Sequence, residues 1–397
     1  MTPWRRTFYA AWVGQICSIT GFTFVMPLMP LYIEQLTYAR TGVLPGAGTV
    51  ALWSGIVASA AAFTMAVFSP IWGAVADRFG RKPMVLRSML GGAAVLLLMA
   101  YARDVTDLLV LRMLQGCLTG TVTANVALVS SITPEERSGY TLGMMQAAVF
   151  CGGAVGPLFG GFMAEYLGFR PTFLVAACVV LLGAFLVKRS VREDFTPAAS
   201  SNEGRLESLR GIFAAGGFVA ALVVLFQVRF ANSVIQPVFA LFVKELHGRA
   251  EGVRAWTGCI AGFASMASAV SAGLLFGWLV NRYGHKRLLV LSTLLSGLVM
   301  IPMAFAGQVW QLFLMRVLFG FLIAATTPCA NVIIRRIIHE RHLGKAYGIT
   351  ASVTCLGWGT APLIGGYIGS AMGLRAPFVL TGVLLLVTSL VVARRIE

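Results

Sequence analysis

The chain has 397 residues, of which 58% are apolar and only 12% are charged. Its 31 Lys and Arg residues outnumber its 15 Asp and Glu residues, which gives a formal net charge of +16. Soluble chains are typically about 25% charged, so this composition argues against a soluble enzyme, a secreted disulfide scaffold and a disordered protein. The excess positive charge points first to a membrane surface rather than to nucleic acid.

Twelve long apolar runs divide the chain, and we interpret each as a membrane-spanning helix because a span needs about 20 mostly apolar residues. The runs lack the alternating polarity that predicts a barrel strand. The first run has no small-residue cleavage site, so it predicts a retained helix rather than a signal peptide. These features predict an all-α membrane protein with twelve transmembrane helices. The expected spans are 8–33, 50–76, 84–102, 106–131, 139–164, 169–188, 211–243, 255–280, 287–306, 309–334, 346–371 and 376–393.

The distribution of basic residues orients these helices, since Lys and Arg are enriched in cytoplasmic segments. When the N-terminus is placed in the cytoplasm, most of the Lys and Arg residues fall in segments on that side. An even number of helices then returns the C-terminus to the same side. We therefore expect a multi-pass membrane protein with both termini in the cytoplasm.

The longest polar stretch, 190–208, predicts a cytoplasmic linker between two groups of six helices. We expect an N-terminal six-helix bundle at 1–189 and a C-terminal six-helix bundle at 209–397. The two halves resemble each other, because the pattern of residues 73–82 recurs at residues 277–286. Such a duplication predicts two bundles related by a pseudo-twofold axis that move about a central binding site, as in transporters.

A cytoplasmic loop between the second and third helices combines glycines, an acid and several cations. One glycine permits close approach of two helices, and another permits a tight turn. Because the acid and the cations lie near a helix end, we interpret the loop as a charge latch that holds one conformation. The alternative is an ordinary cytoplasmic loop whose positive charge only orients the protein. The loop residues are Gly73, Asp77, Arg78, Gly80, Arg81 and Lys82.

The loop at 73–82 resembles the cytoplasmic motif of the major facilitator superfamily. Residues 111–116 resemble the fourth-helix motif of the proton-coupled exporters in that family, and residues 152–161 resemble its fifth-helix antiporter motif. Residues 26–36 and 53–57 are similar to the MdtG-type multidrug exporters of the drug:proton antiporter-1 subfamily. The resemblance covers the whole chain. It implies the twelve-helix fold of that family and export of drugs or other amphipathic compounds across a bacterial cytoplasmic membrane in exchange for protons.

The fifth-helix motif combines a proline with small residues. Proline removes a backbone hydrogen bond and bends a helix, and glycines allow tight helix packing. We therefore expect a hinge or seal that packs against a helix of the other half, although a generic kinked packing helix is the alternative. In the second copy Ala361 replaces the second glycine, which favours the first copy as the functional one. The motif residues are Gly152, Gly156, Pro157, Gly160 and Gly161.

Arg112, Gln115 and Gly116 form the fourth-helix motif. An arginine inside a membrane is costly and needs a partner. In the family this arginine lies near a proton-carrying acid of the first helix, but here that helix has no acid near its middle. Its only acid is Glu34, near the outer end, so we expect Glu34 to pair with Arg112 and to carry the proton. The alternative for Glu34 is a solvated helix end.

Polar residues inside the spans predict the wall of a substrate cavity, because buried polar groups need partners. Arg229 is a candidate for binding an anionic substrate group, and an interhelical ion pair is its alternative. Arg316 repeats Arg112 and is either a cavity residue or a structural one, and Phe24 either lines the cavity or packs in the core. The candidates are Phe24, Asn125, Gln146, Gln227, Arg229, Asn232, Gln236, Arg316 and Trp358.

Three functions stay open at this level. The first is a multidrug exporter driven by the proton gradient, which the aromatic, Met-containing spans with few fixed charges favour. The second is a dedicated exporter of an anionic metabolite such as a siderophore, a phosphonate or an organic acid, which three intramembrane arginines without a nearby acid favour. The third is a receptor or scaffold without transport, against which the intact loop and hinge motifs argue.

The sequence contains no P-loop, nucleophile elbow or metal-spaced cluster, so we expect no enzyme, no cofactor and no metal site. The seven cysteines fall inside apolar runs, where they are expected to act as small packing residues. The expected partners are a small-molecule substrate, protons and the lipid bilayer, and no nucleic acid. A twelve-helix bundle can bury its own core, so we expect a monomer.

Overall fold

The computed structural model describes residues 3–193, 218–337 and 343–395, and nearly all of them lie in helices. No strand occurs in these ranges, which confirms the predicted all-α class. Within them, eleven segments are long and apolar enough to cross a membrane. A further helix of 30 residues, α17 (Leu343–Met372), lies at the predicted eleventh span. The chain is thus a multi-pass membrane protein.

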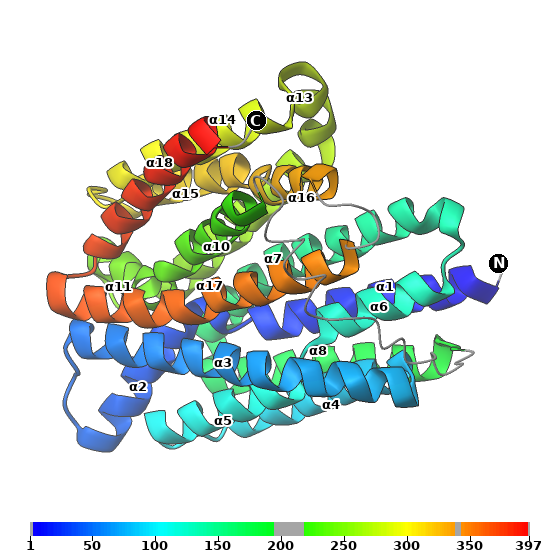
Figure 1. The fold of residues 1–397 in the computed structure, drawn as a ribbon. Coiled ribbons are helices and arrows are strands. Elements are labelled where there is room, and N and C mark those ends of the chain that lie inside the picture. Colours follow the sequence, from blue (N-terminus) through cyan, green and yellow to red (C-terminus); the bar gives the residue numbers. More distant parts are fainter. Residues whose placement is uncertain (1–2, 194–217, 338–342, 396–397) are drawn as a thin grey trace. The chain divides into compact units, whose positions relative to one another are not determined.

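The helices of the first half follow the predicted spans (Figure 1). Two of the connections are single glycines: Gly80 and Gly168 have φ values of +93° and +83°, so the next helix starts directly after each of them. The elements are α1 (Pro3–Thr23), η1 (Met26–Leu28), α2 (Met29–Thr41), α3 (Ala47–Phe79), α4 (Arg81–Met99), α5 (Val105–Leu118), α6 (Thr121–Ile132), η2 (Glu135–Arg137), α7 (Ser138–Leu167) and α8 (Phe169–Ser190).

The second half repeats this order. Its eighth span is continuous through a short π-helical segment, η3, of the kind that occurs as a bulge inside α-helices. The described elements are α10 (Phe218–Val234), α11 (Gln236–His247), α12 (Val253–Val270), η3 (Ser271–Leu275), α13 (Phe276–Tyr283), α14 (His285–Met303), α15 (Val309–Ile323), α16 (Thr326–Ile337), α17 (Leu343–Met372) and α18 (Ala376–Arg395).

Cα packing divides the chain into two compact units that do not follow the chain halves. The first unit contains Met1–Gly46, Ala60–Ala199 and Val243–Met266. The second contains Ala47–Ser59, Ser200–Phe242 and Ala267–Glu397. Each unit therefore incorporates a helix segment from the other half of the sequence. Much of the predicted linker at 190–208 lies outside the described residues, and the bundle boundaries at 1–189 and 209–397 stay a prediction.

In the first unit, α1 packs along α7 and α8, and α4 packs along α8 (Figure 1). Small residues let these backbones approach closely. A Cβ atom added to Gly21 would lie 2.7 Å from the carbonyl oxygen of Ala176. Phe169 and Phe173 are fully buried in this packing. Close backbone contact of this kind stabilises helix pairs in lipid, because the hydrophobic effect does not drive two helices together there and van der Waals packing must do so.

In the second unit, α14 packs along α18 and α10 packs along α17. The same device recurs there, because a Cβ atom on Gly297 would lie 3.0 Å from the carbonyl oxygen of Gly382. The rings of Phe242 and Phe378, both fully buried, have centroids 5.2 Å apart. The two units are thus built by the same rule, small residues at the helix crossings and aromatic residues around them.

Candidate transport site

Four of the predicted spans are broken in mid-course, and the breaks repeat between the halves. In the first unit they lie at 24–28 and at 119–120, where Gly120 has a φ of +129°. In the second unit they lie at 235 and at 324–325. Discontinuous helices in corresponding positions of two repeats are the strongest structural pointer to a transporter binding site. Most of the residues predicted to line a cavity lie on these same spans, whereas Gln146 lies on α7 and Trp358 on α17.

Arg112 lies in α5, two turns before the break at Gly120, and only 3% of it is exposed. Its Nη1 donates to Gln115 Oε1 at 2.7 Å, and its Nη2 donates to Met26 Sδ at 2.9 Å. Its buried Nε has no hydrogen-bond partner in the described part of the chain. Arg112 is therefore held by neutral groups and keeps unused donor capacity.

The predicted pair of Glu34 with Arg112 is wrong. Glu34 Oε1 accepts from Lys244 Nζ of α11 at 2.5 Å. The reason is the break after α1: Arg112 contacts Met26 inside the break, whereas Glu34 lies eight residues further along α2, which is about 12 Å of helix. Glu34 therefore belongs to the ends of α2 and α11, and its role as a proton carrier stays a prediction.

Asn125 of α6 is fully buried, and its Nδ2 donates to Gln15 Oε1 of α1 at 2.7 Å. Asn125 Oδ1 and Gln15 Nε2 are buried without a partner among the described residues. Phe24 is only 4% exposed at the end of α1, as its core-packing alternative predicts, and Gln146 of α7 is exposed. The structure thus adds Gln15 to the predicted set.

In the second unit the predicted polar residues line α10 and the start of α11. Arg229 and Gln236 are exposed, and Asn232 Nδ2 donates to the carbonyl of Val228 one turn earlier at 3.0 Å. Gln227 Oε1 is buried without a described partner. Arg229 makes no ion pair or hydrogen bond with a described residue, so the interhelical ion pair named as its alternative is not seen in this part of the chain.

Arg316 of α15 occupies the position that repeats Arg112. Its guanidinium lies 5.0 Å from the ring centroid of Phe319 and 5.6 Å from that of Phe239. Its Nη1 is buried without a hydrogen-bond partner among the described residues. Two aromatic faces thus replace a carboxylate as the environment of this cation. Trp358 of α17 is half-buried.

Arg87 lies in α4, one to two turns after its start. Its guanidinium lies 3.6 Å from the ring centroid of Trp72, whose Nε1 donates to the carbonyl of Cys117 at 2.7 Å. Two of its nitrogens are buried without a described partner. A cation–π contact with Trp72 is therefore the described interaction of this guanidinium.

The loop at 73–82 is only partly as predicted. Gly80 makes the expected turn with a φ of +93°. No described atom lies within 4 Å of a Cβ placed on Gly73, so the predicted close helix approach at Gly73 is wrong for this structure. Arg78 is exposed, with its guanidinium 5.5 Å from the Phe79 ring centroid. The side chain of Asp77 lies outside the described residues, so the latch stays a prediction.

Glu193 is the acid that meets this loop. Its carboxylate accepts from the backbone N–H groups of Arg81 and Lys82 at 2.8 and 2.7 Å, at the first turn of α4. A carboxylate there satisfies free donors and the positive end of the helix dipole. Lys82 Nζ donates to the carbonyl of Val191 at 2.7 Å, and Arg81 Nη1 to that of Ala127 at 2.9 Å. The cations thus engage neighbouring helix ends, as expected from the sequence.

Three glycines of the fifth-helix motif pack against α1 of the same half. A Cβ on Gly152 would lie 2.9 Å from the Thr20 nitrogen, and one on Gly156 would lie 2.7 Å from the Thr20 oxygen. A Cβ on Gly160 would overlap the carbonyl of Phe24. The prediction that the motif glycines pack against the other half is therefore wrong for these three, because the face of α7 that carries them packs along α1. Gly116 makes a comparable contact with Ala61 of α3.

Gly161 and the carbonyl of Pro157 are motif groups that meet the other half of the sequence. A Cβ on Gly161 would lie 2.8 Å from the Gly258 Cα of α12, and Gly258 in turn abuts the carbonyl of Pro157. In the second unit the repeat of this crossing joins α17 to α3. A Cβ on Gly366 would lie 3.0 Å from the Gly55 Cα. The second copy, with Ala361, makes the same contact as the first, so that substitution does not weaken it.

Glu165 reinforces the crossing of α7 and α12. Its carboxylate accepts from the backbone N–H groups of Gly252 and Arg254 at 2.6 and 3.0 Å, at the start of α12. Arg254 Nη1 donates to the carbonyl of Ala164 at 2.8 Å, and its guanidinium lies 4.5 Å from the Phe169 ring centroid. The sequence prediction missed Glu165. An acid in the last turn of a helix opposes the helix dipole, and this is the signal that indicates an external partner.

Comparisons with known proteins agree with this architecture. The family model of the Major Facilitator Superfamily matches residues 11–248 and 221–396. The multidrug resistance protein MdtG of Salmonella arizonae is 34% identical over 381 residues, which cover 95% of this chain and 92% of that protein. MdtG of Citrobacter koseri is 35% identical over the same shares.

A solved structure of a bacterial homolog of the human lysosomal transporter Spinster, in an inward-facing and occupied conformation, has the same fold. It superposes with a TM-score of 0.79 over 100% of this chain and 98% of that chain, at 16% sequence identity. The duplicated helices, their paired breaks and these matches define a membrane transporter of small molecules and not an enzyme. The chain belongs to the major facilitator superfamily.

Proposed function

We propose that the protein exports drugs or other amphipathic small molecules by alternating access, in exchange for protons. The observation that carries this proposal is the repeated glycine crossing, Gly161 with Gly258 and Gly366 with Gly55. Each crossing joins a helix of one half of the sequence to a helix of the other. Such contacts form and separate as units because packed interfaces are bistable. The names of the MdtG relatives support a drug-like substrate.

In this cycle the two crossings and the predicted loop latch around Asp77 alternate between closed and open states. The proposed substrate-binding residues lie on the broken helices of each unit: Asn125 in the first unit, and Arg229 and Arg316 in the second. Arg229 and the Nη1 of Arg316 offer donors to a bound molecule, and the buried Oδ1 of Asn125 offers an acceptor. The transporter acts as a monomer in a bacterial cytoplasmic membrane, with both termini in the cytoplasm.

The proton step stays assigned to Glu34. Its carboxylate holds Lys244 in the described structure. Protonation would neutralise Glu34 and release Lys244, which couples a proton to the ends of α2 and α11.

Transport into proteoliposomes with an imposed pH gradient tests the proposal. A cationic dye should move against its gradient only when the pH gradient is present, and proton flux should accompany it. Asp77→Asn should impair this flux without reducing the yield of folded protein. If the rate of dye transport is the same for both directions of the imposed pH gradient, proton exchange is not part of the mechanism.

The second candidate is export of an anionic metabolite. It is favoured by Arg229, which is accessible and has no described ion-pair partner, and by the orphan Nη1 of Arg316. In low dielectric an unpaired cation favours an anionic group. Arg229→Ala should then abolish transport of a small organic anion and leave dye export nearly intact. Loss of dye export with retained anion transport would refute the assignment.

A further inference from the structure

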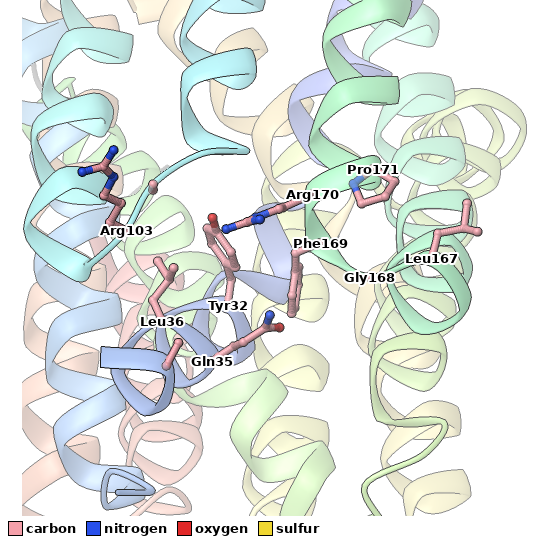
Figure 2. A pocket seen from close by; sticks show the side chains of 11 residues that line it. Tyr32, Gln35, Leu36, Arg103, Leu167, Gly168, Phe169, Arg170 and Pro171 are labelled. Carbon is pink, nitrogen blue, oxygen red and sulfur yellow. The ribbon is translucent and has the colours of Figure 1, made fainter. Parts of the chain in front are cut away.

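A cavity of about 520 Å³ lies within the first unit, away from the residues assigned to the substrate path. It is formed by α2, by the connection between α4 and α5, and by the turn from α7 into α8 (Figure 2). Its main lining residues are Tyr32, Gln35, Leu36, Arg103, Phe169 and Arg170. The sequence prediction assigned no role to these residues beyond counting the two arginines among the outer cations.

The two arginines of the cavity are not neutralised by the acids around them. Arg103 and Arg170 are exposed, and neither side chain makes an ion pair or hydrogen bond with a described residue. The acids nearby are engaged elsewhere: Asp104 pairs with Arg40 at 2.6 Å, and Asp107 accepts from the backbone N–H of Arg103 at 3.0 Å. The cavity therefore holds two guanidinium groups whose donors are not used by a described carboxylate.

The acids on the neighbouring elements are engaged too. Glu34 of α2 holds Lys244, and Glu165 of α7 accepts the backbone N–H groups at the start of α12. An anion that enters the cavity therefore displaces no ion pair already described for this unit. It gains charge-assisted hydrogen bonds to guanidinium groups, which bind phosphate and carboxylate well.

Apart from Gln35, the remaining main lining residues are aromatic or aliphatic. Leu36 and Phe169 are buried at its base. The Tyr32 hydroxyl donates to the carbonyl of Met99 at 2.7 Å, and its ring centroid lies 5.1 Å from that of Phe169. Figure 2 shows the Arg170 side chain reaching across the cavity towards Tyr32. A surface with cations above an apolar, preformed base fits a molecule with an acidic head and an apolar body.

We propose that this cavity binds an anionic amphiphile, with its phosphate or carboxylate group at Arg103 and Arg170 and its apolar part against Leu36 and Phe169. The occupant also contacts the crossing of α7 and α12, because the Phe169 ring is stacked by the guanidinium of Arg254. Binding therefore stabilises that crossing. The site is independent of the exported substrate. The bound amphiphile is either an acidic phospholipid of the bilayer or a soluble amphiphilic acid.

The test is a thermal-shift titration of the purified full chain in a neutral detergent. Decyl phosphate, inorganic phosphate, dioleoylphosphatidylglycerol and dioleoylphosphatidylcholine are the probes. Decyl phosphate should raise Tm, and its apparent Kd should rise at least about tenfold in Arg103→Gln/Arg170→Gln, since each charge-assisted bond is worth about 1.5–3 kcal/mol. The double variant Arg6→Gln/Arg249→Gln, which removes two exposed cations elsewhere, should bind as the unaltered chain does.

Ala39→Glu is the second variant, because Ala39 is an exposed lining residue and a carboxylate there repels the headgroup without disturbing the core. Ala39→Glu should raise the apparent Kd of decyl phosphate as much as Arg103→Gln/Arg170→Gln does. Stabilisation by phosphatidylglycerol but not phosphatidylcholine identifies a lipid source, and stabilisation by decyl phosphate alone identifies a soluble acid. Equal affinity for inorganic phosphate, or unchanged binding in both cavity variants, overturns the proposal.

Discussion

The two glycine crossings are built from the same backbone contact but differ in charge. In the first unit, Gly161 meets Gly258, and the carboxylate of Glu165 caps the start of α12. In the second unit, Gly366 meets Gly55, and the residue four positions further along α17 is Ser370, next to the start of α3. The cap of α3 there is a glycine without a side-chain hydrogen bond. One crossing is therefore held by packing and charge, and the other by packing alone.

The difference separates two physical contributions that usually act together. Glycine contacts determine how closely two helices approach, and any side chain at the contact prevents it. A capping carboxylate adds free energy without changing the approach, because it acts at the helix end. Both copies of the crossing have the glycine contact, whereas the capping carboxylate is present in the first unit. The crossing of α7 and α12 should accordingly be the more stable.

The largest effect is expected from Gly258→Leu. A side chain there overlaps the carbonyl of Pro157, so α7 and α12 must separate. Overpacking costs about 1–3 kcal/mol, which shifts a two-state equilibrium about 5- to 150-fold. Transport should fall accordingly. Spin labels at Tyr166→Cys and Glu251→Cys in a cysteine-free background should report a longer distance.

Two further variants calibrate that result. Gly55→Leu should impair transport as strongly, because the second crossing makes the same backbone contact. Gly143→Leu on α7 should be neutral, since no described atom lies within 4 Å of its Cβ position. A tolerated Gly55→Leu would show that the second crossing does not take part in transport.

Glu165→Gln should have an intermediate effect. The amide oxygen keeps one acceptor but loses the negative charge at the start of α12, which costs about 0.5–2 kcal/mol by analogy with helix caps. The distance distribution of the same labels should shift towards the separated population. Ser370→Ala in the second unit is the matched change and should leave transport unaltered. Equal effects of the two variants would contradict the asymmetry of charge.

Ser370→Glu should give the second crossing a carboxylate at the start of α3, as Glu165 provides at the start of α12. Ser370 lies beside Gly48, in the first turn of α3, where a carboxylate favours the helix dipole by about 0.3–1 kcal/mol. We expect a small rise in Tm and slower transport, since the crossing separates less readily. A fall in Tm with faster transport would show that the start of α3 does not accept a cap.

The smallest effect is expected from the ion pair of Glu34 and Lys244, whose side chains are 15% and 41% exposed. Partly exposed pairs contribute about 0–1 kcal/mol, so a double-mutant cycle with Glu34→Gln and Lys244→Gln should give a coupling below about 1 kcal/mol in unfolding. Transport separates this structural role from proton coupling. Glu34→Gln should abolish transport driven by the pH gradient, and Lys244→Gln should retain it.

Much of the fold was predictable because hydrophobicity along the chain is a one-dimensional property. The spans, the all-α class and the duplication agree with the described helices, and Gly80 turns as its position in the loop predicts. Arg112 is buried, as its position inside an apolar run predicts. The breaks near Pro27 and Pro237 also lie where a proline interrupts an apolar run.

The contacts of the site were less predictable, because they join residues far apart in the chain. The sequence paired Glu34 with Arg112, but the break after α1 separates them and gives Glu34 to Lys244. It directed all motif glycines to the other half, although Gly152, Gly156 and Gly160 face α1. Glu193 and Glu165 bind backbone N–H groups, which carry no side-chain signature in a sequence.

By itself, the sequence determined that this protein lies in a membrane, that it consists of two similar sets of helices and that it carries arginines without acids inside its spans. Those properties follow from composition and periodicity. Only the tertiary structure decided which glycine meets which helix, which acid caps which helix end and where a pair of arginines shares a cavity. These contacts join residues of different helices. Which helix faces meet is determined by tertiary packing and not by the order of residues along one helix.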